Sequence, residues 1–158
     1  MMIVLDTTII SEPLSKQSDE NVIAWLLQNQ ENLYTTAVTI RELLQNIYQL
    51  PPGKRRENLS AAVQHIVSAY KERVLPYEAE AAALHARIMS HAYSVGHQLS
   101  VEDGMIAAVC SVQGGSLATR NTKDFKKLGI NLELIDPFSE PAPNVITVDM
   151  PMEPQVGL

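Results

Sequence analysis

A short apolar run ends in a carboxylate and two hydroxyl groups at Ile3-Val4-Leu5-Asp6-Thr7-Thr8. A strand with apolar side chains on both faces is typical of the centre of a parallel sheet. Asp6 then follows the carboxyl end of this strand, where open α/β sheets bind their ligands. A buried carboxylate is costly unless it is offset, and a divalent cation would offset it because hard cations prefer oxygen ligands. The stretch therefore predicts an α/β fold with an acidic, metal-binding edge.

Length and composition indicate one globular unit of the cytoplasm, because 158 residues suit a single core. The longest apolar runs are shorter than the roughly 20 residues that a bilayer crossing needs, so no membrane contact is expected. The net charge of −6 argues against general nucleic-acid binding, although basic clusters at 54–56 and 120–127 suit a phosphate backbone. The lone Cys110 is expected in the core, and His85, His91 and His97 at or near the surface.

Strand-like and helix-like patterns alternate along the chain. Strands are expected at 3–5, 33–36, 74–75, 117–119 and 132–135, and helices from Ser11 and at 19–30, 39–50, 54–73, 78–95 and 101–112. This alternation predicts βαβ units, and hence a three-layer α/β/α domain with a central parallel sheet of four to five strands. The domain is expected to span residues 1–138. Residues 139–158 are rich in proline and are expected to form an extended or disordered tail.

Glu42 and Asp103 each allow two interpretations. Glu42 follows Thr39 by three residues, and Asp103 follows Ser100 by three, which is the spacing of a helix capping box. Glu42 nevertheless lies opposite the apolar stripe of its helix, on a polar face that includes Asn46. Each acid is therefore a candidate for either a helix cap or a functional site.

Asp124 follows a predicted strand, as Asp6 does, and its alternative role is that of a turn residue. Asp6 and Asp124 follow strands, whereas Glu42 and Asp103 stand near helix N-termini, so all four suit one edge of one sheet. Carboxylates gathered in one crevice repel one another and raise each other's pKa values, and a divalent cation would relieve that repulsion.

Four ordered motifs, at residues 4–12, 38–42, 100–103 and 117–125, resemble those of PIN domains, and in particular VapC toxins of the FitB-like branch. The resemblance implies a ribonuclease that uses Mg²⁺ or Mn²⁺ and acts as the toxin of a type II toxin–antitoxin pair. It also implies a homodimer and a cognate antitoxin, itself a DNA-binding protein. Matched by position, the catalytic and metal-binding acids are Asp6, Glu42, Asp103 and Asp124. Expected substrate-binding residues are Thr7, Thr8, Arg120, Asn121 and Lys123.

Three positions depart from the usual pattern of that family. Thr8 replaces a common Asn, but its hydroxyl can still donate a hydrogen bond to a carboxylate. Asn46 replaces a small residue, commonly Gly, which affects the fit of the substrate more than the binding of metal. Gly104 replaces Ala or a similar residue, at a cost of about 1 kcal/mol in helix propensity that no sequence feature offsets.

Two other functions are compatible with these patterns. In the first, the chain is a catalytically weak PIN-like module in which the acids are caps and the surface binds an antitoxin or DNA-binding partner. In the second, Asp6 accepts a phosphoryl group as in a receiver domain, but the pair of acids that precedes such an acceptor is missing from residues 1–5. Metal-dependent RNA cleavage distinguishes the nuclease from both.

Overall fold

Five short parallel strands form one sheet in the order β3-β2-β1-β4-β5. The computed structural model of the chain describes residues 1–139. The strands are β1 (Ile3–Leu5), β2 (Leu33–Thr36), β3 (Val74–Leu75), β4 (Ser116–Ala118) and β5 (Leu134–Ile135). The predicted parallel sheet is confirmed, and β1 lies at its centre. Of the predicted tail, only Ser139 lies within the described residues.

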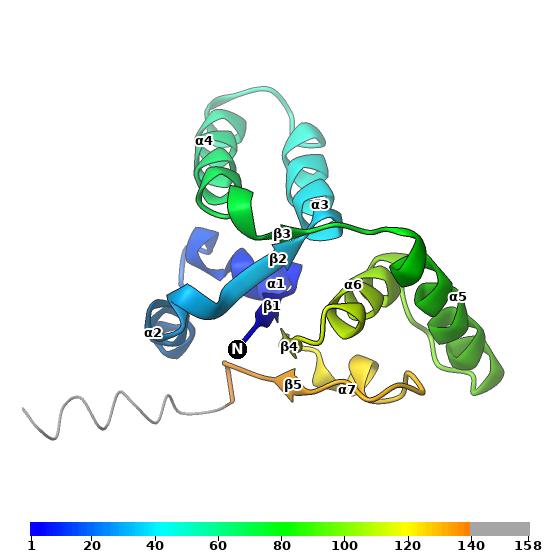
Figure 1. Cartoon of the computed structure of the whole chain (residues 1–158). Helices are drawn as coiled ribbons and strands as arrows, with labels where there is room; N and C mark the ends of the chain where they lie inside the picture. Colours follow the sequence, from blue (N-terminus) through cyan, green and yellow to red (C-terminus); the bar gives the residue numbers. More distant parts are fainter. Residues whose placement is uncertain (140–158) are drawn as a thin grey trace, which may run out of the picture.

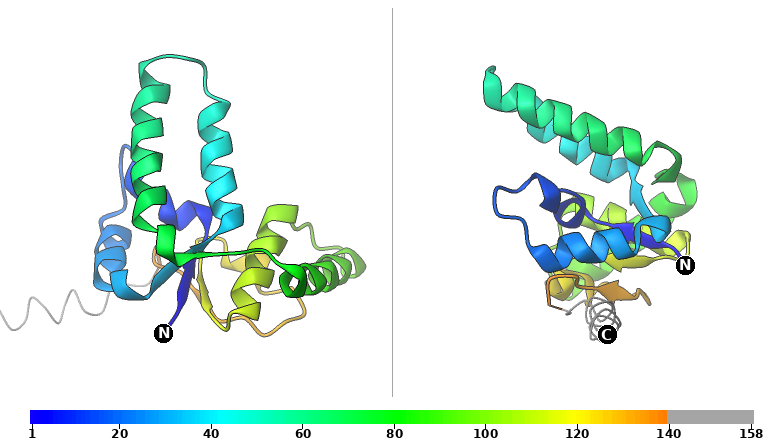
Figure 2. Two further views of the ribbon diagram at one scale, coloured as in Figure 1. Left: turned by 45° about the horizontal axis from the view of Figure 1, so that its top comes forward. Right: turned by 90° about the vertical axis from the view of Figure 1, so that its left-hand side faces the viewer.

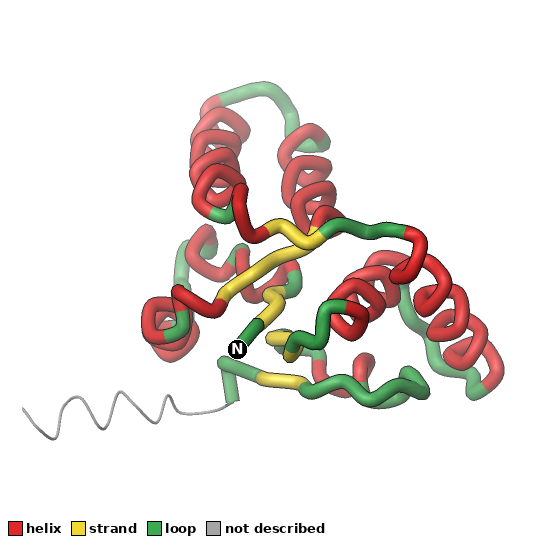
Figure 3. Tube along the Cα trace, viewed as in Figure 1, coloured by secondary structure: helices red, strands yellow, loops and turns green. Residues whose placement is uncertain are grey.

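Helices connect consecutive strands and cover both faces of the sheet, which confirms the three-layer architecture (Figures 1 and 3). The α-helices are α1 (Thr7–Ile10), α2 (Glu20–Gln28), α3 (Ala37–Tyr48), α4 (Lys54–Ala69), α5 (Ala79–Ser94), α6 (Val101–Val112) and α7 (Thr122–Phe125). Short 3-10 turns lie at η1 (Glu12–Leu14), η2 (Gln30–Asn32) and η3 (Lys71–Arg73). Within residues 1–139, no helix has the length and apolar character needed to cross a membrane.

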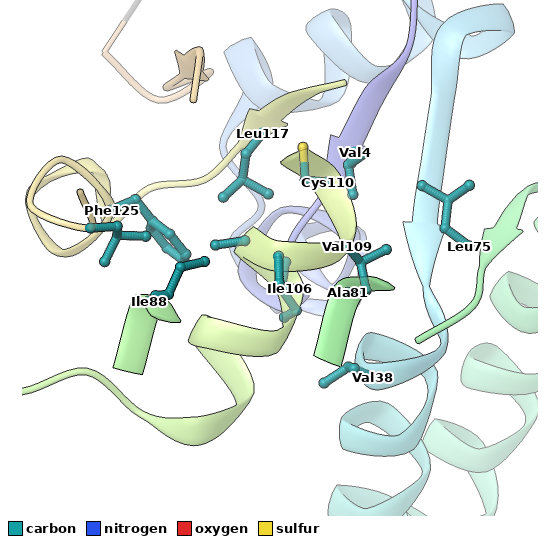
Figure 4. Close-up of a cluster of buried hydrophobic side chains, with 13 residues drawn as sticks. Val4, Val38, Leu75, Ala81, Ile88, Ile106, Val109, Cys110, Leu117 and Phe125 are labelled. Atoms are coloured by element: carbon teal, nitrogen blue, oxygen red, sulfur yellow. The ribbon is translucent and has the colours of Figure 1, made fainter. Parts of the chain in front are cut away.

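The hydrophobic core is divided between the two faces of the sheet because successive side chains of a strand point to opposite sides. Val4 joins Leu117 and Ile106 in the cluster beneath α5 and α6 (Figure 4). Ile3 and Leu5 join the opposite cluster, which includes Trp25 of α2 and residues of α1, α3 and α4. Each fully buried Ile or Leu contributes about 1.5–3 kcal/mol relative to exposure. Cys110 is buried in the first cluster, as predicted, and burial raises the pKa of its thiol to about 12.

The α3–α4 hairpin projects beyond the β2–β3 end of the sheet (Figures 1 and 2). Helix α3 begins directly after β2, capped by the hydroxyl of Thr36, which accepts a hydrogen bond from the Thr39 amide. Leu43 and Ile47 anchor one face of α3 in the core, and Val63 does the same for α4. The polar face of α3 therefore remains outside the core, close to the carboxyl end of the central strand.

Candidate active site

Asp6 is a buried carboxylate at the carboxyl end of β1. Only 5% of its surface is exposed, and its side chain caps α1 by accepting hydrogen bonds from the Ile9 amide at 3.1 Å and the Thr8 hydroxyl at 2.7 Å. The predicted hydrogen bond from Thr8 to a carboxylate is thus confirmed. Burial raises the pKa of Asp6, whereas Thr119, Thr8 and the Ile9 amide act in the opposite direction. Asp6 is therefore held in place by donors that favour its charged form.

Glu42 lies in the second turn of α3, and it is not the capping residue that its spacing from Thr39 allowed. The cap is Thr36, because the helix begins at Ala37, two residues earlier than expected. The Glu42 carboxylate instead accepts a hydrogen bond from the hydroxyl of Thr7, across 35 residues of sequence. This contact ties α3 to the residue that follows Asp6.

Asp103 stands at the start of α6 and is electrostatically coupled to the other three acids. Ser100 caps α6 and accepts a hydrogen bond of 3.0 Å from the Asp103 amide, so Asp103 does stand at the capping position. The pKa of the Asp103 carboxyl is raised to about 6, mainly by burial and further by the charges of Asp6, Glu42 and Asp124, while the hydrogen bond with Ser100 acts in the opposite direction. The structure therefore brings Asp6, Glu42 and Asp124 within electrostatic range of Asp103.

Asp124 lies on the short helix α7, at the same edge of the sheet. Its carboxylate accepts a hydrogen bond from the side-chain amide of Asn121. Its backbone carbonyl lies 2.8 Å from Nε2 of His97, which comes from the loop between α5 and α6. His97 is partly buried, as predicted, but its contact with Asp124 has no local signal in the sequence.

The residues expected to bind substrate have different environments. The hydroxyls of Thr7 and Thr8 are directed to Glu42 and Asp6, and Asn121 is directed to Asp124. The Arg120 guanidinium lies 4.3 Å from the centre of the Phe138 ring. Lys123 is exposed beside Asp124. Thr7, Thr8 and Asn121 therefore orient acids, whereas the side chain of Lys123 is exposed to solvent.

Gly104 allows α6 to pack closely on α5, which is the compensation that the sequence did not reveal. A Cβ atom at this position would lie 2.6 Å from Sδ of Met89 and 2.9 Å from Cδ2 of His85. His85 is held there by Tyr77, whose hydroxyl lies 2.9 Å from its Nδ1 atom. The glycine therefore places the start of α6, and with it Asp103, against α5.

The donor set of this edge fits a hydrated divalent cation. Carboxylate oxygens suit Mg²⁺ or Mn²⁺. The pKa of Asp103 is raised mainly by burial and in smaller part by repulsion from the other three acids, and a cation would relieve that repulsion. Among residues 1–139, no three Asp, Glu, His or Cys side chains converge closely enough to hold a metal ion directly. Mg²⁺ is usually bound by one or two carboxylates and retains several waters. Asp6 and Asp103 are the best candidates for direct ligands, with Glu42 and Asp124 acting through water.

A family model described as "PIN domain" matches residues 3–131. The chain belongs to the PIN-domain family.

Named relatives support a more specific comparison. VapC ribonuclease Y4jK of Sinorhizobium fredii is 38% identical over 143 residues, which cover 89% of this chain and 100% of the relative. Toxin FitB of Neisseria gonorrhoeae is 38% identical over 126 residues, covering 78% of this chain and 91% of the relative. A solved structure of FitAB bound to an IR36 DNA fragment is similar with a TM-score of 0.80 and 33% identity, covering 88% of this chain and 97% of that one.

Proposed function

We propose that this chain is the toxin of a type II toxin–antitoxin pair, a cytoplasmic ribonuclease that hydrolyses RNA phosphodiester bonds with Mg²⁺ or Mn²⁺. The observation that carries the proposal is the group of four acids, in which the charges of Asp6, Glu42 and Asp124 all raise the pKa of Asp103. Relatives named VapC ribonuclease and Toxin FitB support the same function.

The roles of the side chains follow from their contacts. A bound cation would polarise the scissile phosphate and lower the pKa of the attacking water. Asp6 and Asp103 would hold it, each oriented by a hydroxyl residue, Thr8 and Ser100 respectively. Glu42, oriented by Thr7, would accept hydrogen bonds from waters at the site. Lys123 would contact the RNA backbone, since cationic side chains position nucleic acids through their phosphates.

Cleavage of a panel of single-stranded and structured RNAs tests the proposal. Wild-type protein should cleave in Mg²⁺ or Mn²⁺ and stop when EDTA is added. Asp6→Asn keeps the size of the side chain but removes its charge, so it should fold and lose cleavage. Glu57→Gln is the matched control, because Glu57 is an exposed acid on α4, outside the site. Equal cleavage by wild type and Asp6→Asn would refute the assignment.

We also propose that the chain forms a homodimer and binds a cognate antitoxin. The solved FitAB assembly is bound to DNA, which supports a DNA-binding partner. The sequence suggests an interface around Tyr48, Leu50, Tyr70, Arg55 and Arg56. Leu50 and Tyr70 instead pack partly against the core, so Tyr48, 63% exposed, is the aromatic residue left for an interface there.

Two measurements test the proposed partners. A basic antitoxin side chain that pairs with Asp6 or Asp103 should displace the cation. Titrating the co-purified partner should therefore lower both cleavage and cation binding. The mass in solution tests the homodimer, which a monomer at micromolar concentration would exclude. A partner that binds without lowering activity would contradict inhibition through the site.

The catalytically weak binding module is a second candidate, favoured by the separation of the acids within the described residues. It predicts that partner binding survives Asp6→Asn and that wild-type protein cleaves no RNA in either cation. The RNA panel and the partner titration together separate this candidate from the nuclease.

A further inference from the structure

A polar surface pocket lies beside the group of acids, between α3 and α6. Its volume is about 230 Å³, and it is lined by Arg41, Glu42, Gln45, Asn46 and Glu102. Residues four apart lie on one face of a helix, so Arg41 stacks over Gln45 and Glu42 over Asn46. Glu42 therefore belongs both to the group of acids and to the wall of the pocket, so the pocket adjoins that group.

The guanidinium of Arg41 is fixed at one wall of this pocket. It donates to Oε2 of Glu102 at 2.9 Å and to the side-chain oxygen of Gln45. The Arg41 side chain is still 48% exposed, so its plane remains accessible. Guanidinium planes are stacking platforms for unpaired RNA bases, and a plane held by two acceptors needs little further ordering.

Two amide side chains complete the lining. The oxygen of Gln45 is engaged by Arg41, which leaves its amide nitrogen to donate. Among the hydrogen bonds of residues 1–139, none uses the side chain of Asn46, so it offers both a donor and an acceptor. Asn and Gln amides pair with the adjacent donor and acceptor of adenine at N6 and N7. Guanine presents two acceptors at the same edge and would leave the amide oxygen unpaired.

We infer that this pocket receives one unpaired base of the RNA strand, next to the scissile phosphate, and that it prefers adenine. Arg41 stacks on the base and Asn46 reads its edge, while Gln45 adds a donor. The inference rests on the proposed ribonuclease function and adds the substrate preference of the same site.

Cleavage of a degenerate single-stranded RNA library tests the inference. Sequencing of the products of wild-type protein should show adenine enriched roughly ten-fold at one position flanking the cut. A bidentate amide–base pair usually discriminates against the wrong base by about 1–3 kcal/mol, and about 1.4 kcal/mol corresponds to ten-fold. In Asn46→Ala the enrichment should fall to about two-fold or less. Gln49→Ala is the control, because Gln49 is exposed on the next turn and does not line the pocket. An unchanged base profile in Asn46→Ala would overturn the inference.

A binding measurement separates this inference from the proposed function. If wild-type protein cleaves no RNA, the proposed function fails, and the pocket is tested by fluorescence anisotropy with labelled A, C, G and U tetranucleotides in Mg²⁺. Tighter binding of the A tetranucleotide that is lost in Asn46→Ala and kept in Gln49→Ala would support the pocket. Equal binding of all four, or no binding, would overturn it. Melting temperatures within a few degrees of wild type establish that both variants are folded.

Discussion

Arg41 and Glu102 form a 2.9 Å ion pair that joins α3 to α6 at the residues directly before Glu42 and Asp103. Their side chains are 48% and 36% exposed, so water and salt screen the attraction. The pair is therefore better suited to setting the spacing of the two helices than to stabilising the fold.

A double-mutant cycle with Arg41→Gln and Glu102→Gln should give a coupling free energy of about 0.2–1 kcal/mol. Urea denaturation of the four proteins measures it, and a repeat in 1 M NaCl should reduce it because the pair is exposed. A coupling above about 2 kcal/mol that does not respond to salt would mean that the pair is desolvated.

Gly104→Ala should destabilise the protein despite the better helix propensity of alanine. The new Cβ would lie 2.9 Å from the His85 ring, which Tyr77 holds in place. Overpacking costs about 1–3 kcal/mol and the propensity gain returns about 1 kcal/mol, so a net loss of up to about 2 kcal/mol is expected. Chemical denaturation measures the loss. His85→Ala in the same chain should recover part of it, whereas a more stable Gly104→Ala would contradict the close packing of α5 on α6.

Asp103 should make the metal-free protein less stable as the pH rises. Its pKa is about 6 in the folded chain against an ordinary value of 3.8, so the folded state binds more protons between these values. The free energy of unfolding therefore falls as the pH rises through this window, and the full cost is present above it. Asp6 acts in the same direction, whereas the lowered pKa of His85 acts in the opposite one.

The difference in the free energy of unfolding between wild type and Asp103→Asn isolates the contribution of Asp103. Denaturation in EDTA from pH 4 to pH 7.5 should show the variant gaining stability relative to wild type as the pH rises. A difference in the free energy of unfolding that stays constant with pH would mean that the pKa of Asp103 is not raised in the folded chain.

Divalent cations should stabilise the wild-type protein at neutral pH because they bind only the folded group of acids. For a dissociation constant near 1 mM, 10 mM Mg²⁺ would add about 1.4 kcal/mol. Thermal denaturation should show an increase in melting temperature for wild type and for Glu57→Gln, but not for Asp103→Asn. An increase that survives in Asp103→Asn would place the ion elsewhere.

The helices and strands were predictable where the spacing of buried apolar residues is regular. Helix α6 was expected at 101–112 and spans Val101–Val112, since Ser100 caps it and Gly114, with a φ of 72°, follows its end. The positions of Asp6 and Asp124 were predictable for a related reason, because both follow parallel strands whose carboxyl ends meet at one edge of the sheet, and Glu42 and Asp103 lie near the N-termini of α3 and α6. Helices α1 and α7 were missed because four residues are too few to show a helical period.

Contacts between distant segments account for what the sequence did not reveal. The hydrogen bond from Thr7 to Glu42 spans 35 residues, and the contact of His97 with Asp124 spans 27. None of these four residues is unusual in its local sequence, so no local pattern indicates which residues pair. The early start of α3 has a similar cause, since Thr36 ends a strand and caps the following helix at once.

In the proposed function, acids from four segments form one cation site that drives RNA cleavage. A single Mn²⁺ titration tests it most directly, with bound ion followed by electron paramagnetic resonance and cleavage of a labelled RNA measured at each point. The two curves should rise over the same range of Mn²⁺ concentration in wild type and Glu57→Gln, and both should be lost in Asp6→Asn and in Asp103→Asn. Cleavage that is unchanged when Asp6→Asn or Asp103→Asn abolishes Mn²⁺ binding would contradict the claim.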